Sequence, residues 1–207
     1  MRLYFTLDKE KIIVYNLVMA SYYEQAEKIL ENAQGKRLLL HSCCGPCSSS
    51  VLEFLMPKID VTVYYYNPCI MGADEYEHRL SEQRRLCDIL GVKLIVGEYD
   101  NDNYLTTICG LENAPEGGDR CKECFYMRLF KTAQEAKKGG YDYFCTTLTV
   151  SPHKNADVIN SIGKKIESKA MVEFLPSDFK KKNGYLRSIE LSKQYGLYRQ
   201  GYCGCRF

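Results

Sequence analysis

The stretch Leu38-Leu-Leu-His-Ser-Cys-Cys-Gly-Pro-Cys47 joins a short apolar run to three thiols and a Gly-Pro step. A short apolar run that is broken by glycine and proline predicts a buried strand that ends at a turn. Residues 48–55 are typical of the start of a helix, whose first turn tolerates Pro46. The thiols would therefore lie where ligands bind in open parallel α/β sheets, beside the positive end of a helix that favours thiolates. We interpret this stretch as the floor of an active site.

The remainder of the chain alternates between β-rich and helical patterns, which predicts an α/β fold with a mostly parallel sheet flanked by helices in a single domain. Residues 1–17 are ambiguous between strands and turns. Further strands are expected at 61–66, 93–96, 143–148 and 171–175. Helices are expected at about 19–33, 47–56, 73–90, 100–110, 121–138, 151–169 and 187–195.

The composition points to the cytoplasm and to cysteine chemistry. The 207 residues carry a formal net charge of +2, so the whole chain has no strong basic field. No apolar run reaches the roughly 18 residues of a membrane span, and the charged segment 8–11 argues against a signal peptide. We therefore expect a cytoplasmic protein with no membrane partner. Eleven cysteines in such a chain are typical of metal binding or catalysis rather than of a disulfide framework.

A second cysteine motif, Cys121-Lys-Glu-Cys124, follows a Gly- and Pro-rich loop and opens a helix. This spacing aims two thiolates at one centre. With Cys43 and Cys44 it supplies the four thiolates of a cubane iron–sulfur cluster, although a tetrahedral zinc site needs the same ligands. Cys47 reads equally well as a small buried residue of the helix.

The tail carries a third cysteine pair, Cys203 and Cys205. Such a pair closes only a strained ring, and strained disulfides are the redox-active kind. The pair therefore reads as an electron relay or as extra metal ligands, and Tyr198 and Tyr202 are expected to anchor it against fraying. The scattered thiols are expected to be structural, with the turn residue Cys69 as the exception; they are Cys69, Cys87, Cys109 and Cys145.

Other polar residues are weaker candidates. His153 follows a strand end and is a candidate general acid, but it reads equally as a solvated histidine. Asp119 is a weaker proton donor that, like Glu123, is expected to cap its helix. A local group of cations and aromatic rings is expected either to contact nucleic acid or to form a solvated face; its members are Lys180, Lys181, Lys182, Tyr185, Arg187, Tyr198 and Arg199.

Seven motifs together resemble one family, the QueH type of epoxyqueuosine reductase. They are LHSCCGPC (40–47), YYYNPCI (64–70), EYEHRL (75–80), CKECF (121–125), TTLTVSPHK (146–154), DFKKKNGYLRSIELSK (178–193) and YRQGYCGC (198–205). The resemblance runs from about residue 36 to the end, and it divides the chain into an N-terminal extension with a helix at 1–35 and a Rossmann-like catalytic domain with a cysteine-bearing tail at 36–207. Gly201 departs from the acidic residue expected there.

The resemblance implies the last step of queuosine synthesis, in which the epoxide of epoxyqueuosine in the tRNA anticodon loop is reduced to an alkene. It further implies a cobalamin-independent enzyme with a [4Fe-4S] cluster and an electron donor. By position, Cys43, Cys44, Cys121 and Cys124 match the cluster ligands. Cys203 and Cys205 match the redox pair.

Several mechanisms and rivals stay open at this point. The second electron would come from the Cys203–Cys205 dithiol, or a second, mononuclear iron would act as a Lewis acid on the epoxide oxygen. A cluster-dependent tRNA sulfurtransferase is the rival enzyme, although a phosphate-binding glycine loop is missing where Cys43-Cys-Gly-Pro-Cys47 stands. A zinc or redox binding module is the rival outside enzymes. Substrate contacts are expected from Lys181, Tyr185, Arg187 and Arg199.

Overall fold

The computed structural model describes residues 20–205. The expected strands or turns within residues 1–17 lie outside the described residues. Within residues 20–205, no helix combines the length and apolar character needed to cross a membrane.

All five strands of the described chain pair in parallel, in the order β3-β2-β1-β4-β5. The strands are β1 (Arg37–Ser42), β2 (Asp60–Tyr65), β3 (Lys93–Val96), β4 (Tyr143–Thr146) and β5 (Glu173–Phe174). The strand order reverses between β1 and β4, so the crevice beyond their carboxyl ends is the topological switch point of the sheet. The predicted active-site stretch follows β1 directly.

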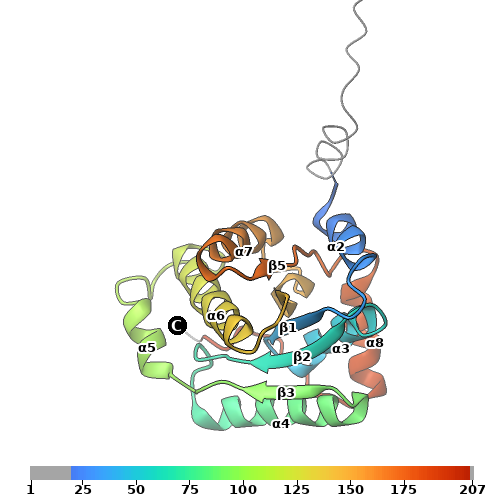
Figure 1. Ribbon diagram of the computed structural model, residues 1–207. Helices are drawn as coiled ribbons and strands as arrows, with labels where there is room; N and C mark the ends of the chain where they lie inside the picture. Colours follow the sequence, from blue (N-terminus) through green and yellow to red (C-terminus); the bar gives the residue numbers. More distant parts are fainter. Residues whose placement is uncertain (1–19, 206–207) are drawn as a thin grey trace, which may run out of the picture.

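The helices cover both faces of this sheet (Figure 1). They are α2 (Tyr22–Leu30), α3 (Gly45–Leu55), α4 (Ala73–Leu90), α5 (Asn101–Thr107), α6 (Asp119–Lys138), α7 (Ala156–Ala170) and α8 (Gly184–Gln194), with a 3₁₀ turn η1 (Thr147–Val150) after β4. Successive side chains of a strand point to opposite faces. Leu38 and Leu40 therefore join a core with α3 and α4, while Leu39 packs with residues of α6 and α7.

Several predicted boundaries differ from the observed ones by two or more residues, and local side chains explain two of these differences. The fourth strand ends at Thr146 because the Thr146 hydroxyl accepts the N–H of Leu148 and starts η1. The next helix begins at Ala156 rather than Ser151, because the Asn155 side chain caps it by accepting the N–H groups of Asp157 and Val158. The last helix begins at Gly184, three residues before the expected start.

The N-terminal helix packs into the same core as the sheet. Ser21 caps α2 in a reciprocal arrangement with Glu24, whose carboxylate accepts the Ser21 N–H. Ala26 and Leu30 are buried beside the leucines of β1. The division of the chain at residue 35 nonetheless stays a prediction, as does the catalytic role of residues 36–207.

Candidate active site

Three thiols gather directly beyond β1. Cys43 and Cys44 follow the strand, Cys47 lies in the first turn of α3, and all three sulfur atoms lie within 4.8 Å of one another. Cys44 is extended, with φ −172°, and stands at the N-cap of α3, so the chain turns sharply between strand and helix. Thr147 fixes Cys43 from the neighbouring strand end, because its hydroxyl accepts the Cys43 N–H and donates to the Cys43 sulfur at 3.3 Å.

A second group of thiols lies at the start of α6. Cys121 and Cys124 lie in the first turns of this helix, and the Cys121 sulfur accepts the N–H of Gly117 at 3.2 Å. Cys124 packs with Cys69, from the turn after β2, and with Cys205 of the tail. Among the scattered cysteines, Cys69 is the one expected to have more than a structural role. The structure is consistent with this expectation, because it buries Cys69 beside Cys124.

The C-terminal tail is docked over the second group. The Met71 N–H donates to the Gly204 carbonyl at 3.0 Å, and a Cβ on Gly204 would lie 2.8 Å from Ile70. Tyr198 anchors the tail through its N–H, which donates to Glu82, and the Tyr202 hydroxyl donates to Glu75. The expected anchoring is confirmed.

The tail brings its cysteine pair to the other thiols. The Cys203 and Cys205 sulfur atoms lie 3.3 Å apart as free thiols.

Two adjoining cavities connect these groups. The first, of about 440 Å³, is lined by Cys43, Cys44, Cys47, Cys69 and Cys203 among others. The second, of about 30 Å³, is lined by Cys121, Cys124, Cys203 and Cys205 among others. Glu116, Arg128, His153, Lys154 and Cys203 line both. The topology thus brings eight of the eleven cysteines, Cys69 included, to one edge of the sheet.

A buried arginine lies between the two thiol groups. Arg128 is 4% exposed and follows Cys124 by one turn of α6. Its guanidinium donates to Asn67 at 2.5 Å and to His41 Nε2 at 3.3 Å, and it reaches the Cys124 sulfur at 3.8 Å. This cation offsets negative charge on the thiolates around it.

Burial and neighbouring charge set the protonation of the site. Burial, followed by the nearby Arg128 guanidinium, lowers the pKa of His41 to about 3, so this imidazole is neutral at pH 7. Hydrogen bonds from the Cys44 and Cys47 thiols hold the pKa of Cys43 well below its usual range. The hydrogen bond with Cys43 in turn raises the pKa of the Cys44 thiol to about 12. Likewise the Cys124 thiol lowers the pKa of Cys69 to about 7. In each of the two groups of thiols, one cysteine therefore loses its proton more readily than its neighbour before any metal binds.

The predicted substrate residues are divided between different places. Tyr185 and Arg199 line the larger cavity, where the Arg199 guanidinium lies 5.4 Å from the centre of the Tyr185 ring. Lys181 lines a neighbouring groove that includes residues of α2. Arg187 forms ion pairs with Glu53 and Glu190 and does not line these cavities. The roles of all four stay predictions.

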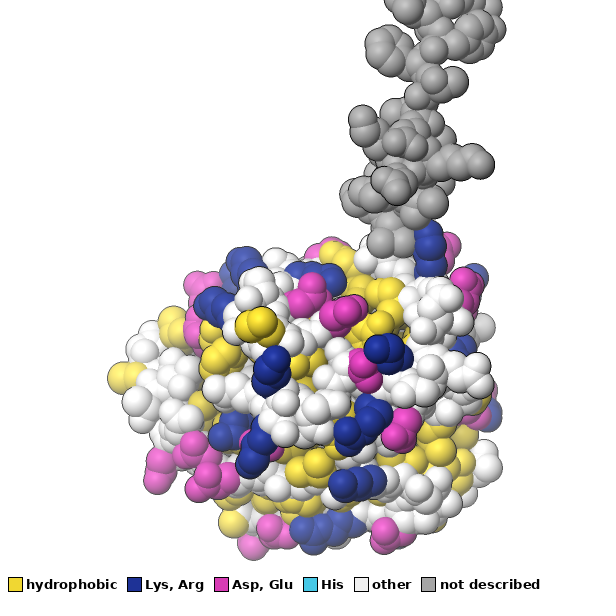
Figure 2. Space-filling model, viewed as in Figure 1, with side chains coloured by type: hydrophobic (Ala, Val, Ile, Leu, Met, Phe, Trp, Pro, Cys, Tyr) yellow, Lys and Arg dark blue, Asp and Glu magenta, His cyan; other side chains and the backbone are white. Residues whose placement is uncertain are grey.

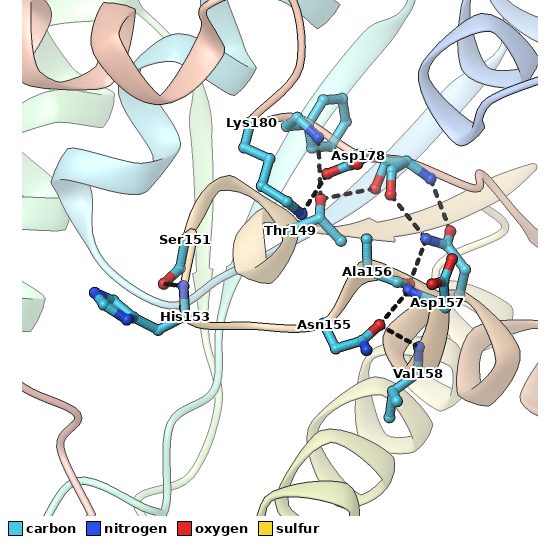
Figure 3. Close-up of polar contacts among 12 residues, drawn as sticks. Thr149, Ser151, His153, Asn155, Ala156, Asp157, Val158, Asp178 and Lys180 are labelled. Carbon is cyan, nitrogen blue, oxygen red and sulfur yellow. Dashed lines mark hydrogen bonds and ion pairs between the residues drawn. The ribbon is translucent and has the colours of Figure 1, made fainter. Parts of the chain in front are cut away.

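Of the two predicted proton donors, His153 lines both cavities, whereas Asp119 lines neither. His153 is exposed, its N–H donates to the Ser151 hydroxyl, and its ring points away from the hydrogen-bonded group around Asp178 and Asn155 (Figure 3). The capping expected of Asp119 was wrong, because Gly118 is the N-cap of α6 and the Asp119 carboxylate pairs with Lys122.

Sequence reasoning missed Arg128 and Lys154 and left Cys47 undecided. The signal for Arg128 is its position four residues after Cys124, which places both on one face of α6. Lys154 is the last residue of the motif TTLTVSPHK (146–154), but nothing in the sequence around it distinguishes it from a solvated lysine. For Cys47, the proximity of its sulfur to the other two thiols shows only in the folded chain.

Comparisons with known proteins place the chain in context. A family model described as "Epoxyqueuosine reductase QueH" matches residues 38–207. The epoxyqueuosine reductase QueH of Streptococcus pyogenes serotype M1 is 42% identical over 93% of this chain and 77% of its own length. That of Thermotoga maritima is 37% identical over 82% of this chain and 88% of its own length.

One solved structure shares the fold. The U34-tRNA thiolase NcsA from Methanococcus maripaludis, solved with its [4Fe-4S] cluster, aligns with a TM-score of 0.54 over 96% of this chain and 69% of its own. The two sequences are 14% identical, so this likeness supports the α/β fold alone.

Proposed function

The chain belongs to the family of QueH epoxyqueuosine reductases, and from this premise we propose how its own residues carry out the reduction. The chain is an oxidoreductase that reduces epoxyqueuosine in tRNA to queuosine. Removing the epoxide oxygen as water leaves an alkene and consumes two electrons and two protons. The observation that carries the proposed site is the gathering of thiols, which can hold a metal and exchange electrons, at the switch point of the sheet.

We propose that Cys43, Cys44, Cys121 and Cys124 hold a [4Fe-4S] cluster. The donor set fits such a group, because all four are thiols and the buried Arg128 cation lies beside them to offset their charge. A bound cluster would supply electrons one at a time. In this assignment the thiols of Cys47 and Cys69 are not cluster ligands. They are therefore available for the alternative arrangement, in which they would bind a second, mononuclear iron that supplies Lewis-acid chemistry.

The Cys203–Cys205 pair is proposed to supply the two electrons together. Closing the sulfur–sulfur bond oxidises the two thiols and releases two electrons and two protons, which equals what the epoxide consumes. The electron donor of the enzyme would then reduce the disulfide again. The 3.3 Å separation of the sulfur atoms and the docking of the tail beside Cys69 and Cys124 support this assignment.

Replacing Cys205 with serine is expected to lower multiple-turnover reduction by about 100-fold or more, which is about 2.7 kcal/mol of barrier. The iron content and the visible absorbance should stay unchanged, because Cys205 is not a proposed cluster ligand. The matched control is Cys109→Ser, an exposed thiol that lines neither cavity. Turnover by Cys205→Ser at the wild-type rate would remove the dithiol from the mechanism.

The tRNA is proposed to enter past Tyr185 and Arg199, with Lys181 on the adjoining groove. Basic and acidic side chains are interspersed on the face shown in Figure 2, and the formal net charge of the whole chain is only +2, so RNA binding is expected to depend on local cations rather than on a broad positive field. Unstacked anticodon bases are recognised by aromatic rings, and their phosphates by cations. Tyr185 and Arg199 provide one of each at the mouth of the larger cavity.

The double variant Lys181→Glu, Arg199→Glu is expected to bind tRNA at least about tenfold more weakly and to show a flatter dependence of affinity on salt, because two phosphate contacts are lost. The measurement is the dissociation constant at several salt concentrations. Lys138→Glu, an exposed cation at the far end of α6, is the control and should keep the wild-type slope. Unchanged affinity and slope in the double variant would exclude this surface.

The function itself is tested by incubating the purified protein, without oxygen or cobalamin, with a reductant and tRNA that carries epoxyqueuosine. The expected product is queuosine, detected by mass as the nucleoside that has lost one oxygen atom. Added ATP should have no effect, because Cys43-Cys-Gly-Pro-Cys47 replaces the glycine-rich loop that cradles phosphates. ATP-dependent incorporation of sulfur would instead favour the sulfurtransferase.

A further inference from the structure

One lysine faces both thiol-lined cavities. Lys154 lies in the segment 151–155 between η1 and α7, at the carboxyl edge of the sheet. Its N–H donates to the Ser151 carbonyl, and the next residue, Asn155, caps α7 with its side chain. Figure 3 shows both flanking residues, His153 and Asn155, of this segment. The backbone on either side of Lys154 is therefore held by a turn and by a helix cap, while its side chain is half-buried.

Among the described cations that line the two cavities, only the ammonium of this lysine has no hydrogen-bond or ion-pair partner. Within the described part of the chain, five cationic side chains line the two cavities: Arg79, Arg120, Arg128, Lys154 and Arg199. Each of the four arginines has a protein partner. Arg79 pairs with a carboxylate, Arg120 donates to a backbone carbonyl and Arg199 donates to serine hydroxyls. Arg128 donates to a buried imidazole and to an amide. Among residues 20–205, the Lys154 ammonium has neither a hydrogen-bond partner nor a carboxylate in ion-pair range.

The surroundings of Lys154 match what the reaction needs. The titratable and charged groups that act on its ammonium are the thiols of Cys43, Cys47 and Cys203 and the guanidinium of Arg128. When the first carbon–oxygen bond of an epoxide breaks, its electron pair stays on the oxygen, which becomes negative. A nearby cation stabilises such a charge, and a proton donor removes it. Lysine offers both on a flexible stem.

We propose that the Lys154 ammonium binds the epoxide oxygen and gives it its first proton as the ring opens. The inference rests on the proposed epoxide reduction. One N–H bond breaks and one O–H bond forms. The two electrons of the reductant, the dithiol or the electron donor, pass to the carbon. The second carbon–oxygen bond then breaks to leave the alkene, the departing hydroxide takes a proton to become water, and the lysine regains its proton from solvent.

Binding without turnover tests the first part of this proposal. In the absence of reductant, cluster-loaded wild-type protein should bind tRNA with epoxyqueuosine about tenfold more tightly than tRNA with queuosine, because only the epoxide offers the acceptor oxygen to a charged donor. Lys154→Met should bind both tRNAs equally, and Lys154→Arg should keep part of the preference. Lys165→Met, an exposed lysine of α7, should keep all of it.

Single-turnover rates test the second part. Lys154→Met is expected to reduce the epoxide about 10²–10³-fold more slowly than wild type, with unchanged cluster absorbance and unchanged affinity for product tRNA. A Lys154→Met protein that keeps the preference and reacts within about threefold of wild type overturns the inference, as does a larger loss in His153→Gln. If wild type itself leaves the epoxide intact, the proposed function fails and not the assignment of Lys154.

Discussion

Replacing Cys124 with serine is expected to leave a protein that has lost most of its iron and that reduces the epoxide at least about 100-fold more slowly, or about 2.7 kcal/mol of barrier. A serine hydroxyl is a poor ligand for cluster iron, which prefers thiolates. Cys124 lies between the Arg128 guanidinium and the Cys69 thiol, so the site has a counter-charge for a thiolate at this position. The measurement is iron per chain together with the visible absorbance.

The matched control for Cys124 is Cys145, which is also buried but lines neither cavity. Its sulfur contacts the Leu175 carbonyl at 3.2 Å, a contact that a serine hydroxyl can make. Cys145→Ser should therefore keep its iron and its absorbance. If Cys124→Ser also keeps a full complement of iron, Cys124 is not a cluster ligand. The same assay on Cys69→Ser then tests whether the neighbouring Cys69 is the ligand in its place.

Replacing Arg128 with methionine is expected to lower the free energy of unfolding by about 1–3 kcal/mol, because the buried Asn67 and His41 side chains lose the donor to which they are hydrogen-bonded. It should also shift the reduction potential of the loaded site to more negative values, since the reduced state carries more negative charge and loses its neighbouring cation. Chemical denaturation measures the first effect. A redox titration followed by electron paramagnetic resonance measures the second.

Arg128→Lys separates charge from geometry. Lysine keeps the positive charge but cannot reproduce the fork that reaches Asn67, His41 and Cys124 at once. The potential should therefore stay nearer to wild type than in Arg128→Met, while the loss of stability should remain. A potential that does not move in Arg128→Met would show that this guanidinium has only a structural role.

Much of the fold was predictable because its signals are local. The Leu38–Leu40 run before a thiol-rich turn predicted a buried strand, and the strand order places its carboxyl end at the switch point. The helix over 73–90 and the strand over 93–96 were confirmed to the residue, because Gly91 in the left-handed region separates them. The chain beyond Thr146 was less predictable, since a threonine hydroxyl and the Asn155 cap, rather than periodicity, fix those boundaries.

The site was predictable only in part, because its contacts span long sequence separations. The spacing of Cys121 and Cys124 indicated a ligand pair, but nothing local joins Cys124 to Cys69 or brings Arg128 to Asn67. Equally, no pattern distinguishes Lys154 from a solvated lysine until the cavities on both sides of it are known. The ligand set, the dithiol and the substrate contacts remain predictions that the variants described above test.

The most direct test of this account is a count of iron and acid-labile sulfide in protein purified without oxygen, with the visible and electron paramagnetic resonance spectra of the same sample. The account predicts about four irons and four sulfides per chain, the content of one cubane. Iron in reproducible excess over sulfide would add the mononuclear centre. Zinc without sulfide would contradict the account and indicate a structural metal site instead.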